Sequence, residues 1–495
     1  MKLNALLMDS EILEIHNPVA DIDVSSIAYN SLKVKPNSLF VAIKGLKTDG
    51  HKYIPDAIKK GAVLIVIEHD LDHYEDGIMY VKVKDARHML GTMASRFYDH
   101  PSEKITVSGV TGTNGKTSVT YMLKSIFEAD NHTCGLMGTI NNQIGHTILD
   151  NDGRTTPDSL EIQEMISEML DAGCDHLMME VSSHALDLDR INGVALDYAI
   201  FSNLTQDHLD YHKTFENYFE AKAKLFTYSR KANIINCDDE WGRKLYERCK
   251  ENSPAATYSY GLHDPSYDFY AKDMTFSMNG THFTLVTPDG ETEIDLKLAG
   301  EVMVYNALAA IANAYLEKVD MEIIKKALSS MQGVEGRMEL LDLDTDFDII
   351  IDYAHSPDSL ERLLKSVKSM YPEGQLYLVF GCNGDRDKEK RPIMGRIAGE
   401  FADYVVVTSD NPASEDPQSI IDTVAAAVAE KTDAYETVLR RWDAIYHAVT
   451  LPKAGDVLVL AGKGHEKQET MADENLYYNE WETAEEAVRR LKAQA

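Results

Sequence analysis

Short apolar runs separated by polar stretches recur along the chain and predict an α/β protein. In the first 100 residues the runs are SLFVAIKG (38–45), AVLIVIE (62–68) and IMYVKV (78–83). Runs of this length and composition, bounded by polar or helical segments, are typical of buried strands. Residues 1–100 are therefore predicted to form a small α/β domain. It ends at YDHP (98–101), because a residue before proline is pushed out of the helical conformation.

Two further series of runs predict two more domains. The second domain, 101–335, has strands at ITVSGV (105–110), HLMMEV (176–181), YAIFSNL (198–204) and ANIINC (232–237). Its polar stretch 250–295 indicates meandering β structure or loops, and NALAAIANAYL (306–316) has helical periodicity. The third domain, 336–495, begins at the glycines of GVEGRMEL (333–340). Strands expected at 348–354, 375–381, 404–410 and 456–462 alternate with helical stretches, which predicts a doubly wound, Rossmann-like sheet.

Composition excludes several classes of partner. The 495 residues include 81 acidic and 49 basic side chains, a formal charge of -32, which would repel nucleic acid or an anionic membrane. No run approaches the roughly 18 to 20 apolar residues of a membrane helix, and the amino terminus lacks the apolar core of a signal peptide. The five cysteines form no Cys-x-x-Cys pair, which favours reduced, structural thiols. We therefore expect a cytoplasmic protein with no inserted membrane segment, and a phosphate-bearing ligand must meet local positive charge.

The strongest local signal is GVTGTNGKTSVTYMLKSIF (109–127), in which a strand leads through a glycine-rich turn into a helix. Backbone amides of such a turn and the helix N-terminus bind phosphates, while the lysine reaches β and γ phosphates and the hydroxyl ligates magnesium. The strict P-loop spacing is not met, because position 110 is Val110 rather than glycine. We predict a variant phosphate loop. Its residues are Gly112, Thr113, Asn114, Gly115, Lys116, Thr117 and Ser118.

A second signal is a lysine on an apolar helix face. Phe215, Tyr218, Phe219, Leu225 and Phe226 mark a stripe at helical spacing, with Lys222 in its middle and Lys224 on the opposite side. The helical pattern by itself favours the interpretation that Lys222 is a snorkelling or ion-paired side chain. Burial also favours the neutral amine, the form that reacts with carbon dioxide to give a carbamate, an oxygen ligand suited to magnesium.

Glu180 and His208 each follow a predicted strand of the same domain. Ligands of open α/β sheets bind at the carboxyl ends of strands. A lone histidine there is more often a loop residue, but together with a modified Lys222 the two make a second magnesium site plausible next to the phosphate loop.

Many ordered motifs resemble the Mur ligase family of peptidoglycan synthesis. They are TGTNGKT, MEVSSHAL, NLTQDHLDYH with AK at 221–222, VYNALAA, GRME, DYAHSPDSLE, GDRDKEKRP, SDNPASEDP and AGKGHE, and they span essentially the whole chain. The resemblance is greatest to members that add the third residue of the muramyl peptide. It implies a UDP-substrate domain, a central P-loop ATPase domain and a Rossmann-like C-terminal domain that carries the amino acid.

The resemblance also implies roles for individual residues. Magnesium would be held by Thr117, Glu180, His208 and carbamylated Lys222, with catalysis by Lys116, Lys222, His208 and Glu180, and Asn306, Arg337 and His355 would bind or orient ATP. Ser31 and the segment 44–54 would contact the UDP portion, and Thr155, Thr156, Ser182 and Arg190 the muramyl dipeptide. The chain departs from the family pattern at Asn30 and Leu32, where Asp and Arg are common, and at Leu188.

The chemistry expected from this resemblance is an ATP-driven amide ligation. Phosphorylation of the D-glutamate carboxylate of UDP-N-acetylmuramoyl-L-alanyl-D-glutamate would give an acyl phosphate, which the amine of an amino acid attacks. Unconditional turnover of ATP would contradict it. We expect the enzyme to be a monomer.

The amino acid is predicted from the C-terminal motifs. Relatives that use meso-diaminopimelate have an arginine where this chain reads Asp410, Asn411, Pro412, Ala413, and alanine cannot pair with a distal carboxylate. The nearby acids Glu415 and Asp416 would suit an ammonium, so we predict L-lysine. The alternatives are meso-diaminopimelate and ornithine. The expected amino-acid site comprises Arg386, Asp410, Asn411, Pro412, Ala413, Gly462 and Glu466.

Rival functions stay open at this point. A folylpolyglutamate synthase shares the central fold and the acyl-phosphate chemistry but lacks the domain before the phosphate loop. A P-loop kinase or nucleotide switch needs no amino-acid domain after the ATPase domain, and a kinase would not release free phosphate. An inactive binding module is disfavoured by the presence of Lys116, Thr117, Glu180, His208 and Lys222 together.

Overall fold

The computed structural model describes residues 1–8, 11–19, 22–45, 48–149, 151, 153–277 and 280–494. Two compact units emerge, each built from separate stretches of the chain. The first comprises Met1–Thr111, Asn131–Ala199 and Ala221–Ala232, and the second Gly112–Asp130, Ile200–Glu220 and Asn233–Ala495. Among the described residues, no helix is long and apolar enough to cross a membrane.

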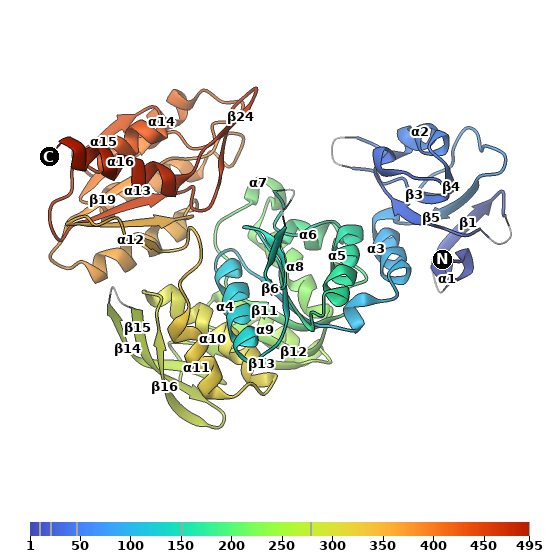
Figure 1. Cartoon of the computed structure of the whole chain (residues 1–495), viewed down its shortest axis with the longest axis horizontal. Coiled ribbons are helices and arrows are strands. Elements are labelled where there is room, and N and C mark those ends of the chain that lie inside the picture. The colour runs from blue at the N-terminus through green and yellow to red at the C-terminus, as the bar shows by residue number, and fades with distance from the viewer. Residues whose placement is uncertain are drawn as a thin grey trace. The chain divides into compact units, whose positions relative to one another are not determined.

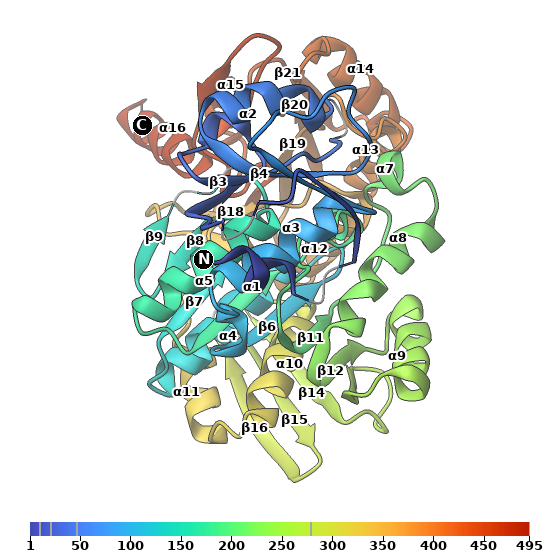
Figure 2. The same cartoon turned by 90° about the vertical axis from the view of Figure 1, so that its right-hand side faces the viewer.

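The N-terminal region folds around a five-stranded sheet of order β1-β5-β4-β3-β2, in which only β1 is antiparallel to its neighbour. The predicted runs at 38–45, 62–68 and 78–83 become β3, β4 and β5, and β4 is buried almost throughout because helices cover a parallel sheet on both faces. Figure 2 shows α2 close to β3 and β4. The elements are α1 (Leu3–Leu7), β1 (Ile12–His16), β2 (Ser26–Ala28), η1 (Ser31–Lys33), β3 (Ser38–Val41), η2 (Gly50–Tyr53), α2 (Ile54–Lys59), β4 (Ala62–Ile67), β5 (Met79–Val83), α3 (Ala86–Phe97) and η3 (Pro101–Glu103).

The middle of the chain contributes an eleven-stranded sheet of order β16-β15-β14-β13-β12-β11-β6-β10-β7-β8-β9. The polar stretch 250–295 forms the antiparallel meander β14-β15-β16, which Figure 1 shows next to α11. The strands are β6 (Thr106–Thr111), β7 (Cys134–Met137), β8 (Asn142–Ile144), β9 (Thr147–Leu149), β10 (His176–Glu180), β11 (Leu196–Phe201), β12 (Ser229–Asn236), β13 (Ala256–Gly261), β14 (Phe269–Ser277), β15 (Gly280–Thr287) and β16 (Gly290–Leu296).

Helices of the same region begin where the sequence provides caps or glycine. Asp239 caps α9 and Asp320 caps α11 through their carboxylates, while α10 begins after Gly300, one turn before the predicted start at 306. The helices are α4 (Lys116–Ala129), α5 (Ser159–Asp171), α6 (Ser183–Asp187), α7 (Leu209–His212), α8 (Phe215–Ala223), η4 (Lys224–Thr227), α9 (Glu240–Asn252), α10 (Glu301–Leu316) and α11 (Met321–Ser330).

The C-terminal region confirms the doubly wound prediction. Its six-stranded sheet has the order β17-β18-β22-β19-β20-β21, parallel except for β17, and separate apolar clusters lie on its two faces. One cluster packs α12, α13 and α14, and the other packs α15 and α16. The elements are β17 (Glu339–Leu341), β18 (Asp348–Asp352), α12 (Pro357–Met370), β19 (Leu376–Phe380), α13 (Lys390–Phe401), β20 (Tyr404–Thr408), α14 (Pro417–Val428), β21 (Tyr435–Val438), α15 (Arg441–Ala448), β22 (Val457–Ala461), β23 (Gln468–Thr470), β24 (Asn475–Tyr477) and α16 (Glu480–Gln494).

Candidate active site

The predicted phosphate loop lies between β6 and α4. Gly112 and Gly115 have φ of 152° and 89°, and α4 begins at Lys116 with Gly115 as an N-cap that has no side chain to bind the first amides. Lys116 Nζ donates to the carbonyls of Gly112 at 3.0 Å and Thr113 at 2.9 Å, which holds the ammonium over the loop. The first backbone amides of α4 have no side-chain partner from the N-cap residue, and the ammonium of Lys116 lies beside them. This arrangement suits the binding of a phosphate group.

Glycine is required at position 115 for a second reason. A Cβ built there would lie 2.4 Å from Oδ1 of Asn306, a buried residue of α10. Asn306 therefore packs directly against the turn. Gly115 and Asn306, both predicted to bind ATP, are therefore brought together by the close approach of α10 to the loop.

Side chains on the loop after β11 hold the phosphate loop in shape. Asn203 accepts from the amide of Asn114 through Oδ1 at 2.9 Å, and Thr113 Oγ1 lies 3.1 Å from the hydroxyl of Tyr218 on α8. Thr205 N donates to Thr113 Oγ1 at 3.0 Å. Asn203 is not among the predicted site residues, although it is the first residue of the motif NLTQDHLDYH.

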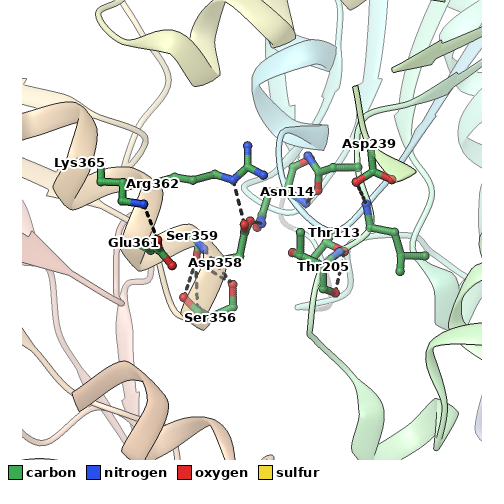
Figure 3. A network of polar contacts seen from close by, with 12 residues as sticks. Thr113, Asn114, Thr205, Asp239, Ser356, Asp358, Ser359, Glu361, Arg362 and Lys365 are labelled. Atoms are coloured by element: carbon green, nitrogen blue, oxygen red, sulfur yellow. Dashed lines mark hydrogen bonds and ion pairs between the residues drawn. The ribbon is translucent and has the colours of Figure 1, made fainter. Parts of the chain in front are cut away.

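The phosphate loop also contacts α12. Asn114 Nδ2 donates to Asp358 Oδ2 at 3.2 Å, and Arg362 Nε donates to the other carboxylate oxygen at 2.9 Å. Figure 3 shows Asn114 and Arg362 meeting Asp358 from different sides. Asp358 thus joins a helix of the C-terminal sheet to the loop, and the sequence contained no local signal for this contact.

Arg337 and His355 lie near the same loop in the second unit. Arg337 Nη2 donates to Thr117 Oγ1 at 3.4 Å and its guanidinium lies 4.5 Å from the ring centre of Tyr353. Burial and the neighbouring Lys390 lower the pKa of His355, whose Nδ1 lies 2.9 Å from the carbonyl of Tyr353.

Asp207 precedes His208 and belongs to the same electrostatic group. Burial alone would raise the pKa of Asp207, but attraction by His208, His355 and Lys390 outweighs it and lowers the pKa. His208 has a left-handed φ of 54°, and its side chain is 42% exposed with Nε2 3.4 Å from Asp207 Oδ2. Asp207 is a functional candidate that the residue patterns did not identify.

Glu180 and Lys222 are both deeply buried in the first unit, at 0% and 1% exposure. Glu180 accepts from the amide of Thr139 at 2.9 Å and from its hydroxyl at 2.8 Å. A charged carboxylate and an amine with so little solvent need compensating partners. Both positions have the donor chemistry that suits a bound cation, the lysine after conversion to a carbamate.

The four residues predicted to hold the dipeptide form a connected group. Thr155 Oγ1 lies 3.1 Å from Thr139 Oγ1, while Thr156 Oγ1 donates to the carbonyl of Glu180 at 2.9 Å and accepts from the amide of Ser182 at 3.1 Å. Arg190 Nη1 donates to the carbonyl of Thr156 at 3.0 Å. The group adjoins the carboxyl end of β10.

Three arginines converge on Asp158 beside that group. Arg190 Nε lies 3.0 Å and Arg87 Nη1 3.9 Å from Asp158 Oδ1, and Arg154 pairs with the other oxygen. The hydroxyl of Tyr29 donates to Asp158 Oδ2 at 3.2 Å. In a chain of such negative charge, this cluster supplies the local positive charge that an anionic ligand needs.

Ser31 is buried in η1, and its carbonyl accepts from Lys60 Nζ at 3.0 Å. It belongs to the same short segment as Tyr29 but makes none of the contacts to Asp158. Within the predicted segment 44–54, Leu46 and Lys47 lie outside the described residues.

The predicted amino-acid site is organised by Lys463, which the sequence analysis did not include. Lys463 is 0% exposed and its Nζ donates to Asn411 Oδ1 at 2.7 Å and to the carbonyl of Gln468 at 2.6 Å. Glu466 Oε2 lies 3.2 Å from the same ammonium and accepts from Asn411 Nδ2 at 2.7 Å.

Asp410 completes the buried part of this site. It lies 3.8 Å from Lys463, and burial raises its pKa. Gly462 has φ of 111°, and a Cβ there would lie 2.6 Å from Asp410 Oδ2. A Cβ on Gly384 would similarly lie 1.8 Å from the carbonyl of Pro412, while Arg386 on the same loop is exposed. The structure brings Asp410, Asn411, Gly462 and Glu466 together.

Of the two acids near Ala413, Glu415 is already paired with basic side chains. Glu415 accepts from both terminal nitrogens of Arg391, at 2.9 and 3.0 Å, and lies 3.0 Å from Lys388, and these hydrogen bonds lower its pKa to about 2. Asp416 accepts from the amide of Ser419 as the N-cap of α14. The expectation that Glu415 would attract a distal ammonium is therefore wrong, because its charge is compensated by Arg391 and Lys388. Asp416 caps a helix and is exposed.

Comparison with known families accounts for nearly the whole chain. Residues 23–98 match the catalytic domain of the Mur ligase family, residues 110–314 the Mur ligase middle domain, and residues 336–464 the Mur ligase glutamate ligase domain. This confirms the predicted three-domain architecture.

Individual proteins give a finer comparison. UDP-N-acetylmuramoyl-L-alanyl-D-glutamate--2,6-diaminopimelate ligase of Clostridioides difficile (strain 630) is 42% identical over 492 residues, which cover 99% of this chain and 100% of that protein. A solved structure of a ligase of the same name superposes with a TM-score of 0.69 at 30% identity, covering 95% of each chain. These relatives favour the diaminopimelate alternative and do not support the prediction of L-lysine.

The folylpolyglutamate synthase of Mycobacterium tuberculosis has a TM-score of 0.63 at 18% identity, covering 82% of this chain and 95% of that one. At this identity the likeness shows a shared fold. The match of residues 23–98 to a Mur ligase domain weighs against that rival function.

Proposed function

The chain belongs to the Mur ligase family of ATP-dependent acid–amino-acid ligases, and from this premise we propose that it joins meso-2,6-diaminopimelate to UDP-N-acetylmuramoyl-L-alanyl-D-glutamate. The observation that carries the proposal is the 42% identity, over the full length of both chains, to a ligase named for that reaction. The reaction belongs to peptidoglycan synthesis, and we expect a cytoplasmic, monomeric enzyme.

Domain roles follow the same proposal. Residues 1–100 bind the UDP portion, residues 101–335 bind ATP, and residues 336–495 bind the incoming amino acid. The phosphate loop Gly112–Ser118 holds the triphosphate, since α4 begins there without a side-chain cap and Lys116 is held over the turn. Asn306, Arg337 and His355 orient the nucleotide.

The proposed task of buried Glu180 and Lys222 is to hold the magnesium that neutralises negative charge during phosphoryl transfer. Thr117, Glu180, His208 and a carbamylated Lys222 are the proposed magnesium ligands, supported by the burial of Glu180 and Lys222 and by the oxygen chemistry of the set. Magnesium, when bound, offsets the negative charge that gathers on the transferred phosphoryl group. Lys116 offers a second cation at the same group.

The acidic substrate is proposed to bind at the cluster of Arg87, Arg154 and Arg190. Thr155, Thr156 and Ser182 supply hydroxyl groups beside it. A bound carboxylate or diphosphate replaces Asp158 as the partner of one or more guanidinium groups, which keeps the positive charges compensated. Phosphorylation of the D-glutamate carboxylate then makes its carbon electrophilic.

The amine of the amino acid attacks that acyl phosphate, and phosphate leaves. Asp410, Asn411, Pro412, Gly462 and Glu466 are the proposed contacts of the amino acid, with Arg386 on the adjacent exposed loop. Ala413 offers no guanidinium, so exposed Arg386 is the proposed partner for a distal carboxylate on this loop, since Lys388 is paired with Glu415.

Product mass spectrometry tests the proposal directly. The enzyme is incubated with ATP, magnesium, the UDP-muramyl dipeptide and equal amounts of meso-diaminopimelate, L-lysine and L-ornithine. We expect the diaminopimelate tripeptide as the main product and one phosphate per amide bond, with none formed by Lys116→Ala. A lysine product would contradict the substrate assignment. Phosphate release without dipeptide or amino acid would contradict the ligase mechanism.

A further inference from the structure

Two histidines and one carboxylate meet at the end of β10 that lies away from Glu180. His132 Nδ1 lies 2.8 Å from Asp175 Oδ2, and His176 Nδ1 lies 3.1 Å from Asp175 Oδ1. One ligand atom from each of the three residues lies within 4.8 Å of the other two, and the imidazole centres are 4.2 Å apart. None of these residues belongs to the proposed active site.

The geometry points to a binding site for a divalent transition-metal ion, such as Zn²⁺, formed by His132, Asp175 and His176. Zinc bonds to imidazole nitrogen and carboxylate oxygen are about 2.0–2.2 Å long, so ligand atoms in a tetrahedral site lie about 3.3 Å apart. The nitrogen–oxygen distances of 2.8 and 3.1 Å need only small expansion. Two imidazoles and a carboxylate select zinc, nickel or cobalt over magnesium, which prefers oxygen ligands.

The three residues come from two loops that are already joined by backbone hydrogen bonds. His132 lies in the turn before β7, and Asp175 lies directly before β10. The amide of Asp175 donates to the carbonyl of Thr133 at 3.0 Å, and Thr106 N donates to the carbonyl of Asp175 at 2.9 Å. The backbone at the three ligand residues is therefore held in place before an ion binds, and a bound ion would link the turn before β7 to the start of β10.

Exposure is compatible with ion entry. The side chain of His176 is 9% exposed, whereas those of His132 and Asp175 are 33% and 53% exposed. One ligand is thus fixed by packing and two face solvent, which leaves the remaining coordination position to water. Because the site is remote from Glu180 along β10, its role is to stabilise the sheet.

A similar-looking cluster in the described residues provides a matched control. Asp49, His51 and His69 also lie within ligating distance of one another. However, His51 uses Nδ1 for Asp49 at 2.7 Å and Nε2 to accept the amide of Glu68 at 3.0 Å. Both of its ring nitrogens are committed to the protein, so we expect no ion there.

Titration calorimetry with zinc chloride tests the site. The sample is the untagged, full-length enzyme, freed of transition metals and kept in excess magnesium at pH 7.5. We expect one zinc ion per chain, with affinity weakened roughly tenfold or more in His132→Gln and in Asp175→Asn and unchanged in His69→Gln. Binding should weaken in acid, because zinc and protons compete for the imidazole nitrogens. Bound cobalt should give the visible absorption of a tetrahedral ion.

Thermal unfolding gives an independent readout. Zinc should raise the unfolding midpoint of the wild type and of His69→Gln, and should not raise that of His132→Gln, whose half-exposed position lets the variant fold. The proposal is overturned if the wild type binds no stoichiometric zinc at about 0.1 mM metal. Equal zinc affinity in the wild type, His132→Gln and Asp175→Asn would overturn it as well.

Discussion

Lys222 and Lys224 are two positions apart, yet their environments are opposite. Lys222 is 1% exposed, whereas the side chain of Lys224 is 45% exposed and lies 3.7 Å from Asp187. Lys222 lies in the last turn of α8 and Lys224 begins η4, and a helical rotation of about 200° over two residues directs the two side chains to opposite sides. Of the two, only Lys222 is shielded from solvent, as the proposed carbamate site is.

We expect Lys222→Ala to lower the rate of tripeptide formation by about 10²–10³-fold, because an anionic metal ligand is removed from the site of charge development. Lys224→Ala is the matched control and should remain within about twofold of the wild type, since its ion pair is exposed. The measurement is the steady-state rate of phosphate release with both co-substrates. Equal activity of the two variants would rule out a catalytic amine at position 222.

His465 controls a pH dependence of stability. Burial, with repulsion by Arg337, His355 and Lys467, lowers the pKa of His465 to about 3, against an ordinary value near 6.5. Between these values the unfolded chain binds the proton and the folded chain does not, so acid favours unfolding. Stability from this residue is present above about pH 6.5 and falls as the pH drops below it.

We therefore expect His465 to lower the free energy of unfolding by about 1 kcal/mol between pH 7 and pH 5.5. His465→Gln cannot titrate and should show a shallower dependence, with His355 retaining its own contribution of the same sign. Urea unfolding at several pH values, followed by fluorescence, measures both proteins. A steeper dependence in the variant would contradict the assignment.

At the scale of elements, a side-chain contact between Asp358 and Asn114 joins α12 to the phosphate loop. Asp358 accepts from Asn114 at 3.2 Å and from Arg362 at 2.9 Å, as Figure 3 shows. The loop starts α4, so the contact connects the nucleotide-binding turn to a helix of the C-terminal sheet. Removal of Asn114 or Asp358 leaves the other side chain with one hydrogen bond fewer.

A double-mutant cycle on this contact should show coupling. Asn114→Ala and Asp358→Ala should each raise the KM for ATP. Expressed as free energies, the effect of the double variant should be smaller than the sum of the two single effects by about 0.5–1.5 kcal/mol. Glu361→Ala is the control, because Glu361 pairs only with exposed Lys365 one turn away on the same helix. Additive effects within about 0.3 kcal/mol would mean that the contact does not bear on ATP binding.

At the scale of the whole molecule, the formal charge of -32 opposes compaction. Repulsion between exposed carboxylates extends over about 30 Å at 0.01 M salt but only about 8 Å at 0.15 M. The folded chain holds these charges closer together than the unfolded chain does. Salt should therefore stabilise the fold.

We expect the thermal unfolding midpoint to rise by a few degrees between about 0.01 M and 0.15 M sodium chloride. Potassium chloride at equal ionic strength should have the same effect, whereas an uncharged solute at equal osmolality should not reproduce it. Differential scanning calorimetry provides the midpoints. A midpoint that falls with salt would show that attractive surface ion pairs outweigh the net repulsion.

The sequence by itself determined the features that depend on neighbouring residues. Apolar runs located β3, β4, β10, β19 and β22, because a strand buried on both faces must be apolar over consecutive positions. The glycines around Lys116 indicated the phosphate loop, and helical spacing placed Lys222 inward and Lys224 outward. In each case the physical constraint acts within a few residues of chain.

Only the tertiary structure decided which charges compensate one another. Lys463 is buried next to Asn411 and Glu466. Arg391 forms an ion pair with Glu415, so Glu415 does not indicate the substrate as its sequence position suggests. Asp158 gathers Arg87 and Arg190 from distant parts of the chain. Ion pairing depends on distance in space, and residues separated by many positions approach one another only once the sheets and their loops have formed.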